Sequence, residues 1–196
     1  MWLTLSELLA QVLAAVAVAA AVRFLDDAVD GHRDSPLEGF SSSLLGEGGR
    51  VAYALFFFAL AVVFDRGWAV TLFLAAYAVG MASEPGRALP SGLPSWVESA
   101  VAAIVSLGGF GLPATISSLA AVASVQAVDD LVDRKKDRLE GRRGNWALAL
   151  GVPTVSCLLV GLLLLGAAVH PWKTVVVAGV GGIFTALRRR GFRGLA

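Results

Sequence analysis

The chain has 196 residues, of which 57% are hydrophobic and 16% are charged, and its formal net charge at pH 7 is +1. With a mean hydropathy of +0.74, this composition lies well outside the range of water-soluble globular domains, in which about 25% of residues are charged. It does not indicate a nucleic-acid partner either, because the six basic residues within 134–143 are interleaved with acidic residues and have no aromatic residue among them.

Apolar residues gather in seven blocks along the chain. At about 1.5 Å of rise per residue, roughly 17–25 apolar residues cross a bilayer as a helix. The blocks occupy approximately residues 2–25, 50–64, 68–83, 95–110, 112–128, 145–169 and 172–187. They predict an all-α fold, a polytopic transmembrane helical bundle of about seven helices that forms a single transmembrane domain over residues 1–196.

The distribution of basic residues predicts the orientation of this bundle. If the N-terminus lies outside, fourteen of the sixteen Lys and Arg residues lie on or next to the cytoplasmic side, and only Arg66 and Lys173 face out. This asymmetry is typical of integral membrane proteins, here expected in the plasma membrane of a prokaryote. It also requires that 95–128 forms two helices, which turn at GGFGLP (108–113).

An acidic motif occurs twice on the predicted cytoplasmic side. Residues 26–39 read DDAVDGHRDSPLEG and residues 129–141 read DDLVDRKKDRLEG, and together they hold eight of the nine aspartates. This indicates an internal duplication, with repeat one at about 1–83 and repeat two at about 95–190. Because both motifs lie on one side, the repeats are expected to be parallel, with the functional site at their interface.

The spacing of the aspartates favours a metal site. In each copy three of them follow D-x2-D-x3-D, which places them within roughly 60° of one helix face. Like charges this close either repel one another or recruit a cation, and oxygen-only ligands suit Mg²⁺. Solvated charges that set the topology are the alternative interpretation. The predicted metal ligands are Asp26, Asp27, Asp30, Asp34, Asp129, Asp130, Asp133 and Asp137.

These motifs resemble those of the UbiA superfamily of intramembrane prenyltransferases. That family carries NDxxDxxxD at the end of its second helix and DxxxDxxxD, or close to it, at the end of its sixth. Here DDAVDGHRD (26–34) and DDLVDRKKD (129–137) stand at corresponding places, with Asp26 where the family has Asn. The second copy continues DRLEGRR, similar to the family's D-(K/R)-x-x-G-x-(R/K). The loop ASEPGRALP (82–90) is similar to the family's YSxPPxRLK, and the resemblance spans residues 10–190.

The resemblance implies a Mg²⁺-dependent transfer of a prenyl group from a prenyl diphosphate to a lipophilic acceptor within the membrane. It implies that the two aspartate clusters face each other across one cavity near the cytoplasmic interface. The residues it assigns to catalysis are Asp27, Asp30, Asp130 and Asp133. Those it assigns to the diphosphate are Arg33, Arg87, Lys135, Lys136, Arg138 and Arg142.

The sequence also leaves three alternative functions open. A CDP-alcohol phosphotransferase motif begins like Asp27-Ala-Val-Asp30-Gly31, but the following residues break it. A divalent-cation transporter and a non-catalytic prenyl-lipid-binding membrane protein are the other two. Family members have nine helices, so the sides of residues 5–22 and 172–187 are expected to face membrane lipids, or to form a homodimer through AGVGG (178–182), since small residues allow close helix approach.

Overall fold

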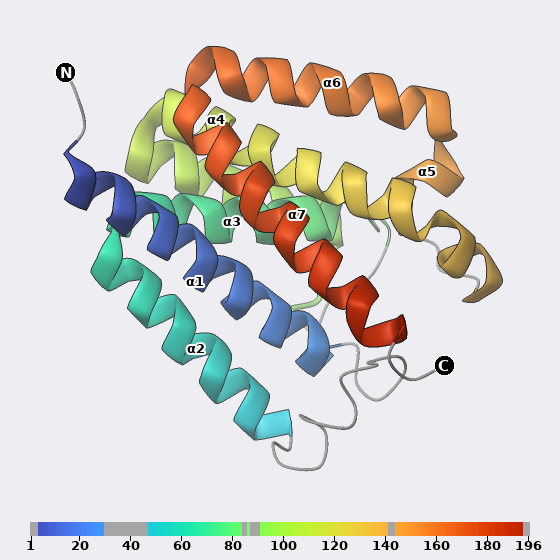
Figure 1. The fold of residues 1–196 in the computed structure, drawn as a ribbon, viewed down its shortest axis with the longest axis horizontal. Helices are drawn as coiled ribbons and strands as arrows, with labels where there is room; N and C mark the ends of the chain where they lie inside the picture. Colours follow the sequence, from blue (N-terminus) through green and yellow to red (C-terminus); the bar gives the residue numbers. More distant parts are fainter. Residues whose placement is uncertain (1–3, 30–46, 84–85, 87–90, 141–143, 194–196) are drawn as a thin grey trace. The chain divides into compact units, whose positions relative to one another are not determined.

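The computed structural model describes residues 4–29, 47–83, 86, 91–140 and 144–193. In this part of the chain the regular elements are seven α-helices (Figure 1). They are α1 (Leu5–Val29), α2 (Glu47–Phe64), α3 (Arg66–Ser83), α4 (Ser95–Glu140), α5 (Trp146–Ala149), α6 (Val152–Val169) and α7 (Pro171–Arg193). The predicted all-α class and the expected number of about seven helices are confirmed.

The helices belong to two compact units. One unit comprises residues 1–69 and 180–196, and the other comprises residues 70–179. The predictions of a single domain and of parallel repeats stay predictions.

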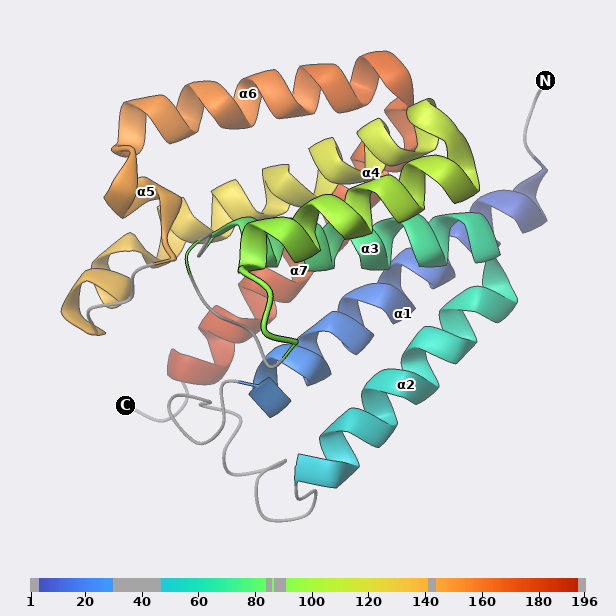
Figure 2. The same ribbon diagram turned by 180° about the vertical axis from the view of Figure 1, so that it is seen from behind.

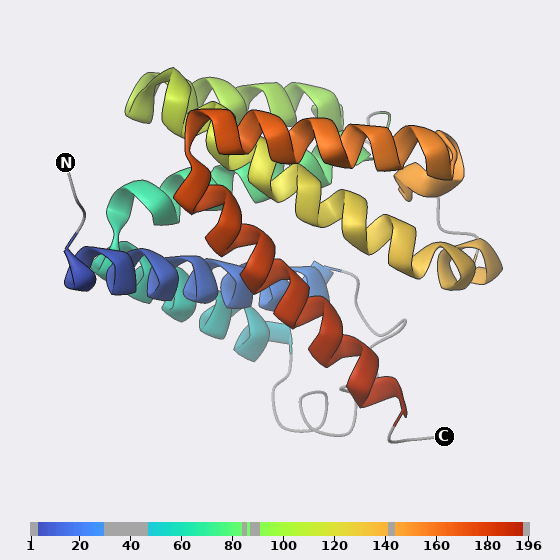
Figure 3. The ribbon, with the colours of Figure 1, turned by 45° about the horizontal axis from the view of Figure 1, so that its top comes forward.

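In the first unit α1 and α2 pack side by side (Figures 1 and 3). Both helices are apolar and rich in alanine, and Ala54 and Ala61 of α2 are buried. At the end that carries the acidic motif, the ring of Phe24 stacks on Tyr53 and on Phe57, with centroid separations of 5.9 and 5.6 Å. Small residues allow the helices to approach closely, and the rings fill the space where the motif begins.

In the second unit α4 folds back on itself at Gly111. This residue has φ 80° and ψ 170°, a conformation that glycine adopts without a Cβ clash. Across the turn the hydroxyls of Ser106 and Thr115 are hydrogen bonded at 3.0 Å in a buried position. Figure 2 shows residues 95–110 and the rest of α4 as an antiparallel hairpin. The expected turn within GGFGLP is therefore confirmed.

Helices α5 and α6 follow the second arm of α4. A cluster of Ala127, Ala147 and Val155, with Leu131 and Leu159 packed against it, joins α4 to both helices, and α6 runs along this arm (Figure 3). The prediction of one helix over 145–169 is wrong, because the chain breaks at Gly151, which has φ +85°. A residue with a side chain would be strained there.

Some of the helices suit a membrane by length and composition. Among the described residues, Leu5–Ala28, Ser95–Leu139 and Val152–Val169 are long and apolar enough to cross one, and Gly48–Phe64 and Pro171–Leu187 are shorter apolar helices. Large apolar side chains point outward from α6, where Leu164 is 66% exposed. Such a surface is unfavourable in water and favourable in lipid. The orientation with the N-terminus outside stays a prediction.

Helix packing near the α6–α7 turn gives a stability prediction. A Cβ on Gly166 would lie 2.7 Å from Oγ1 of Thr174 and 3.6 Å from Cβ of Ala120. Gly166→Ala is therefore expected to lower the free energy of unfolding by about 1–3 kcal/mol through overpacking. Gly161→Ala is the matched control, since a Cβ on Gly161 meets nothing within 4 Å. Thermal unfolding in detergent measures both variants, and equal melting temperatures would contradict this packing.

Candidate functional site

Residues 129–140 of the second acidic motif form the last turns of α4, where the carboxylate of Asp130 is held on both oxygens. Its Oδ1 accepts a hydrogen bond of 2.8 Å from Nε2 of Gln126, and its Oδ2 accepts one of 2.7 Å from the backbone N–H of Trp146. Asp130 is only 5% exposed. A buried carboxylate needs such donors because it has lost its water, and here both come from the protein.

Asn145 connects the motif to the segment that follows. Its Nδ2 donates to the backbone oxygen of Asp130 at 2.9 Å and to Oδ2 of Asp137 at 2.7 Å. Its Oδ1 accepts from the backbone N–H of Leu148 at 3.0 Å, so that Asn145 is the N-cap of α5. Asparagine is a favoured N-cap residue, and here the same side chain also fixes two aspartates.

Burial divides the aspartates of this motif into two groups. Asp130 and Asp137 are buried, at 5% and 9% exposure, whereas Asp129 and Asp133 are half-exposed. Residues three and four apart are neighbours on a helix, so Asp133 adjoins both buried aspartates as well as Asp129, and the two groups differ in burial while lying on one helix face. The aspartates predicted to act together thus lie in two environments.

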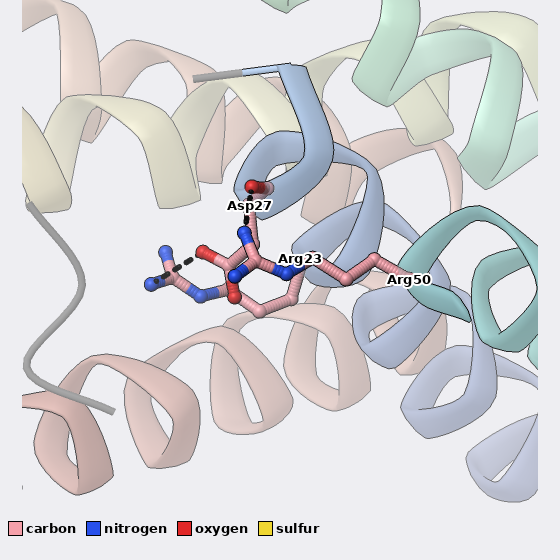
Figure 4. A network of polar contacts seen from close by, with 3 residues as sticks. All are labelled: Arg23, Asp27 and Arg50. Atoms are coloured by element: carbon pink, nitrogen blue, oxygen red, sulfur yellow. Dashed lines mark hydrogen bonds and ion pairs between the residues drawn. The ribbon is translucent and has the colours of Figure 1, made fainter. Parts of the chain in front are cut away.

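The described part of the first motif shows a related arrangement. Oδ1 of Asp27 lies 3.0 Å from Nη2 of Arg23 in an ion pair, and Nη1 of Arg50 donates to the backbone oxygen of Asp27 at 2.6 Å. Figure 4 shows both guanidinium groups beside Asp27. Arg50 is 8% exposed, and its Nε is buried and has no hydrogen-bond partner among the residues that the structure describes. Asp26 is exposed.

The two copies share two anchoring contacts. In each, the side chain four residues before the second aspartate contacts its carboxylate: Arg23 contacts Asp27, and Gln126 contacts Asp130. In each, a side chain from the following segment donates to the backbone oxygen of that same aspartate, from Arg50 or Asn145. Arg23 and Gln126 stand 103 positions apart, as Asp27 and Asp130 do, whereas Arg50 and Asn145 are 95 positions apart. The donors are charged in the first copy and neutral in the second.

The likeness between the copies extends to the helices that follow. Both α2 and α6 have 18 residues. Asp65 ends the first, and its Oδ1 accepts from the N–H of Trp68 at 2.9 Å. His170 ends the second, and its Nδ1 accepts from the N–H of Lys173 at 3.2 Å. Burial, with the charge of Lys173, lowers the pKa of His170, which favours the neutral ring that can accept this bond.

The other predicted site residues are distributed as follows. At the end of α4, Lys135 and Arg138 are exposed and Lys136 is half-exposed. The predicted site residues Asp30, Asp34, Arg33, Arg87 and Arg142 lie outside the described residues. Whether the two motifs face one cavity stays a prediction.

The described carboxylates suit Mg²⁺ by their chemistry. In the described ranges, no three His, Cys, Asp or Glu side chains are grouped so that they could hold a metal ion. Mg²⁺ is commonly bound by one or two carboxylates together with water and substrate phosphates, and the carboxylates of Asp129 and Asp133 are donors of that chemical type. The eight-aspartate ligand set itself stays a prediction.

Sequence reasoning missed the residues that anchor the motifs. Gln126 could have been found by aligning the repeats, since it stands where Arg23 stands in the first copy. Asn145 carries a weaker signal, as a favoured N-cap residue before an apolar stretch. No pattern singles out Arg50 from the other basic residues. Comparisons with protein-family models, with curated proteins and with solved structures find no match to this chain.

Proposed function

We propose that this chain is an integral membrane prenyltransferase of the UbiA type, which transfers a prenyl group from a prenyl diphosphate to a lipophilic acceptor. The observation that carries the proposal is the duplicated acidic motif at the ends of apolar helices, with the same anchoring contacts in both copies. A motif that only set topology would need no such contacts, since topology follows Lys and Arg.

The chain's own residues have two tasks in this reaction. Negative charge builds on the diphosphate as the allylic C–O bond breaks, and Mg²⁺ bound by the aspartates would offset it. Lys135 and Arg138 are exposed at the end of the same helix and can donate charge-assisted hydrogen bonds to phosphate oxygens. The prenyl chain would lie among the apolar, alanine-rich helices, out of contact with water.

Diphosphate release tests the proposal. Purified protein in lipid nanodiscs is incubated with prenyl diphosphates of increasing chain length, with Mg²⁺ or with EDTA, and released diphosphate is measured. We expect release that requires Mg²⁺ and that rises when a lipid extract supplies an acceptor. Mg²⁺-dependent binding without release would support the non-catalytic prenyl-lipid-binding alternative. Neither binding nor release with any chain length, together with Mg²⁺ uptake into proteoliposomes, would support the transporter instead.

A further inference from the structure

The two aspartates of the Asp129–Asp130 pair have different surroundings. Both oxygens of Asp130 accept hydrogen bonds from protein donors, and the side chain is 5% exposed. A cation that used these oxygens would have to displace the bonds to Gln126 and Trp146. Asp129 and its neighbour at i+4, Asp133, are half-exposed on the adjoining part of the same helix face. Water and a bound ligand can therefore reach this second pair more easily.

The contacts of Asp130 connect the end of α4 to α5. Through its carboxylate it holds the first residue of α5, and through its backbone oxygen it holds Asn145, which also binds Asp137. These bonds tie the end of α4 to the segment that follows and so set the rotation of α4 about its axis. The direction in which Asp129 and Asp133 point depends on that rotation.

The first copy has the same kind of anchoring contacts, although its Asp27 is half-exposed, at 16%, and not buried. Asp27 is tied to Arg23 through its carboxylate and to Arg50 through its backbone oxygen, while Asp26 is exposed. Because Arg50 belongs to α2, these contacts fix the end of α1 to the next helix. The positions that carry the anchors are equivalent in the two motifs, although the donor chemistry differs.

We propose that the second aspartate of each pair, Asp27 and Asp130, is a positioning residue and not a metal ligand or catalytic carboxylate. Together with Arg23 and Arg50, or with Gln126 and Asn145, it orients the motif. The cation and the diphosphate are then met by the neighbouring, more exposed aspartates of the same helix face, which in the second copy are Asp129 and Asp133. The inference rests on the proposed function and revises the roles that the family resemblance implies for Asp27 and Asp130.

The substitution Asp130→Asn distinguishes a positioning role from a metal-ligand role for Asp130. An asparagine can accept from the N–H of Trp146 through Oδ1, and its Nδ2 can donate to Gln126 once that amide flips, because an amide carries both a donor and an acceptor. The anchor therefore survives in Asp130→Asn, although the negative charge is lost. It does not survive in Asp130→Ala. If Asp130 were a metal ligand, Asp130→Asn would weaken metal binding about as much as Asp130→Ala does, because the loss of the negative charge alone removes the ligand.

The experiment compares Asp130→Asn, Asp130→Ala and Asp133→Asn in nanodiscs by three measurements. These are the melting temperature, the affinity for Mn²⁺ as a substitute for Mg²⁺ by electron paramagnetic resonance, and diphosphate release. We expect Asp130→Asn to keep the melting temperature within about 2 °C and to lower kcat no more than about tenfold. Asp130→Ala should lower the melting temperature by roughly 4–10 °C, since two bonds to a buried group are lost. Asp133→Asn should lower the melting temperature less than Asp130→Ala does and should weaken Mn²⁺ binding at least about tenfold.

The outcomes distinguish the inference from the proposed function. If Asp130→Asn weakens Mn²⁺ binding as much as Asp133→Asn does, Asp130 is a ligand and the inference is overturned. Equal melting temperatures for Asp130→Asn and Asp130→Ala would also overturn it, because the anchor would then contribute nothing. A wild-type protein that releases no diphosphate would contradict the proposed function, while the order of melting temperatures would still decide the role of Asp130. Asp27→Asn and Asp27→Ala repeat the comparison in the first motif.

Discussion

Replacing Asp129 and Asp133 together by asparagine is expected to lower Mg²⁺-dependent diphosphate release by roughly a thousandfold. Both residues are half-exposed, and in the proposed function they hold the cation that stabilises the leaving group, so the loss of both charges would remove that stabilisation. Removal of one preorganised electrostatic contact typically costs a factor of about 10²–10³. The melting temperature should hold, since neither residue belongs to the buried group around Asn145.

A matched control separates this effect from a general loss of negative charge. Asp65→Asn also removes one carboxylate, but asparagine can still accept from the N–H of Trp68 and cap α3. This variant should release diphosphate like the wild-type protein. If the Asp129/Asp133 double variant kept even a tenth of wild-type release, the assignment of this pair to the metal and diphosphate would be wrong.

Asn145→Ala is expected to produce the largest loss of stability, about 3–5 kcal/mol. The change removes the donors to the backbone oxygen of Asp130 and to Asp137, and it removes the N-cap of α5. Bonds to charged groups contribute about 1.5–3 kcal/mol each and an N-cap about 1 kcal/mol. Because Asp137 is only 9% exposed, water cannot easily replace the lost donor.

Denaturant titration in mixed micelles measures this loss. Leu139→Ala is the control, since Leu139 is on the same helix and is 90% exposed, so its truncation should change the free energy of unfolding by less than about 0.5 kcal/mol. A loss below about 1 kcal/mol for Asn145→Ala would mean that these hydrogen bonds do not hold the end of α4.

Most of the helical framework could be predicted from the sequence because apolar blocks and glycine-rich breaks are local signals. The blocks at 50–64 and 68–83 match α2 and α3 closely, and the turn near Gly111 follows from the GGFGLP sequence. The break at Gly151 was missed, since hydropathy is continuous across it and only the positive φ of that glycine separates α5 from α6.

The candidate site could be predicted only in its composition. Helical periodicity indicates which aspartates share a face, but it does not determine which face packs against the rest of the chain. The burial of Asp130 depends on Asn145 and Trp146, which approach it only after the chain has passed the end of α4. The burial of Arg50 depends in the same way on the end of α1. Such tertiary contacts leave no periodic pattern in the sequence.

The central prediction, which follows from the family resemblance, is that both acidic motifs serve one cation and diphosphate site, and crosslinking tests it most directly. The variant combines Ala28→Cys and Val132→Cys in a Cys157→Ser background, and native membranes that contain it are treated with a bis-maleimide that spans ~15 Å. Mg²⁺–oxygen bonds are about 2.1 Å long, so carboxylates that share one cation site would bring the two cysteines within reach of this reagent. We predict efficient crosslinking within one chain. If each single cysteine reacts with a monofunctional maleimide but the pair does not crosslink, the motifs lie apart and the one-site function is contradicted.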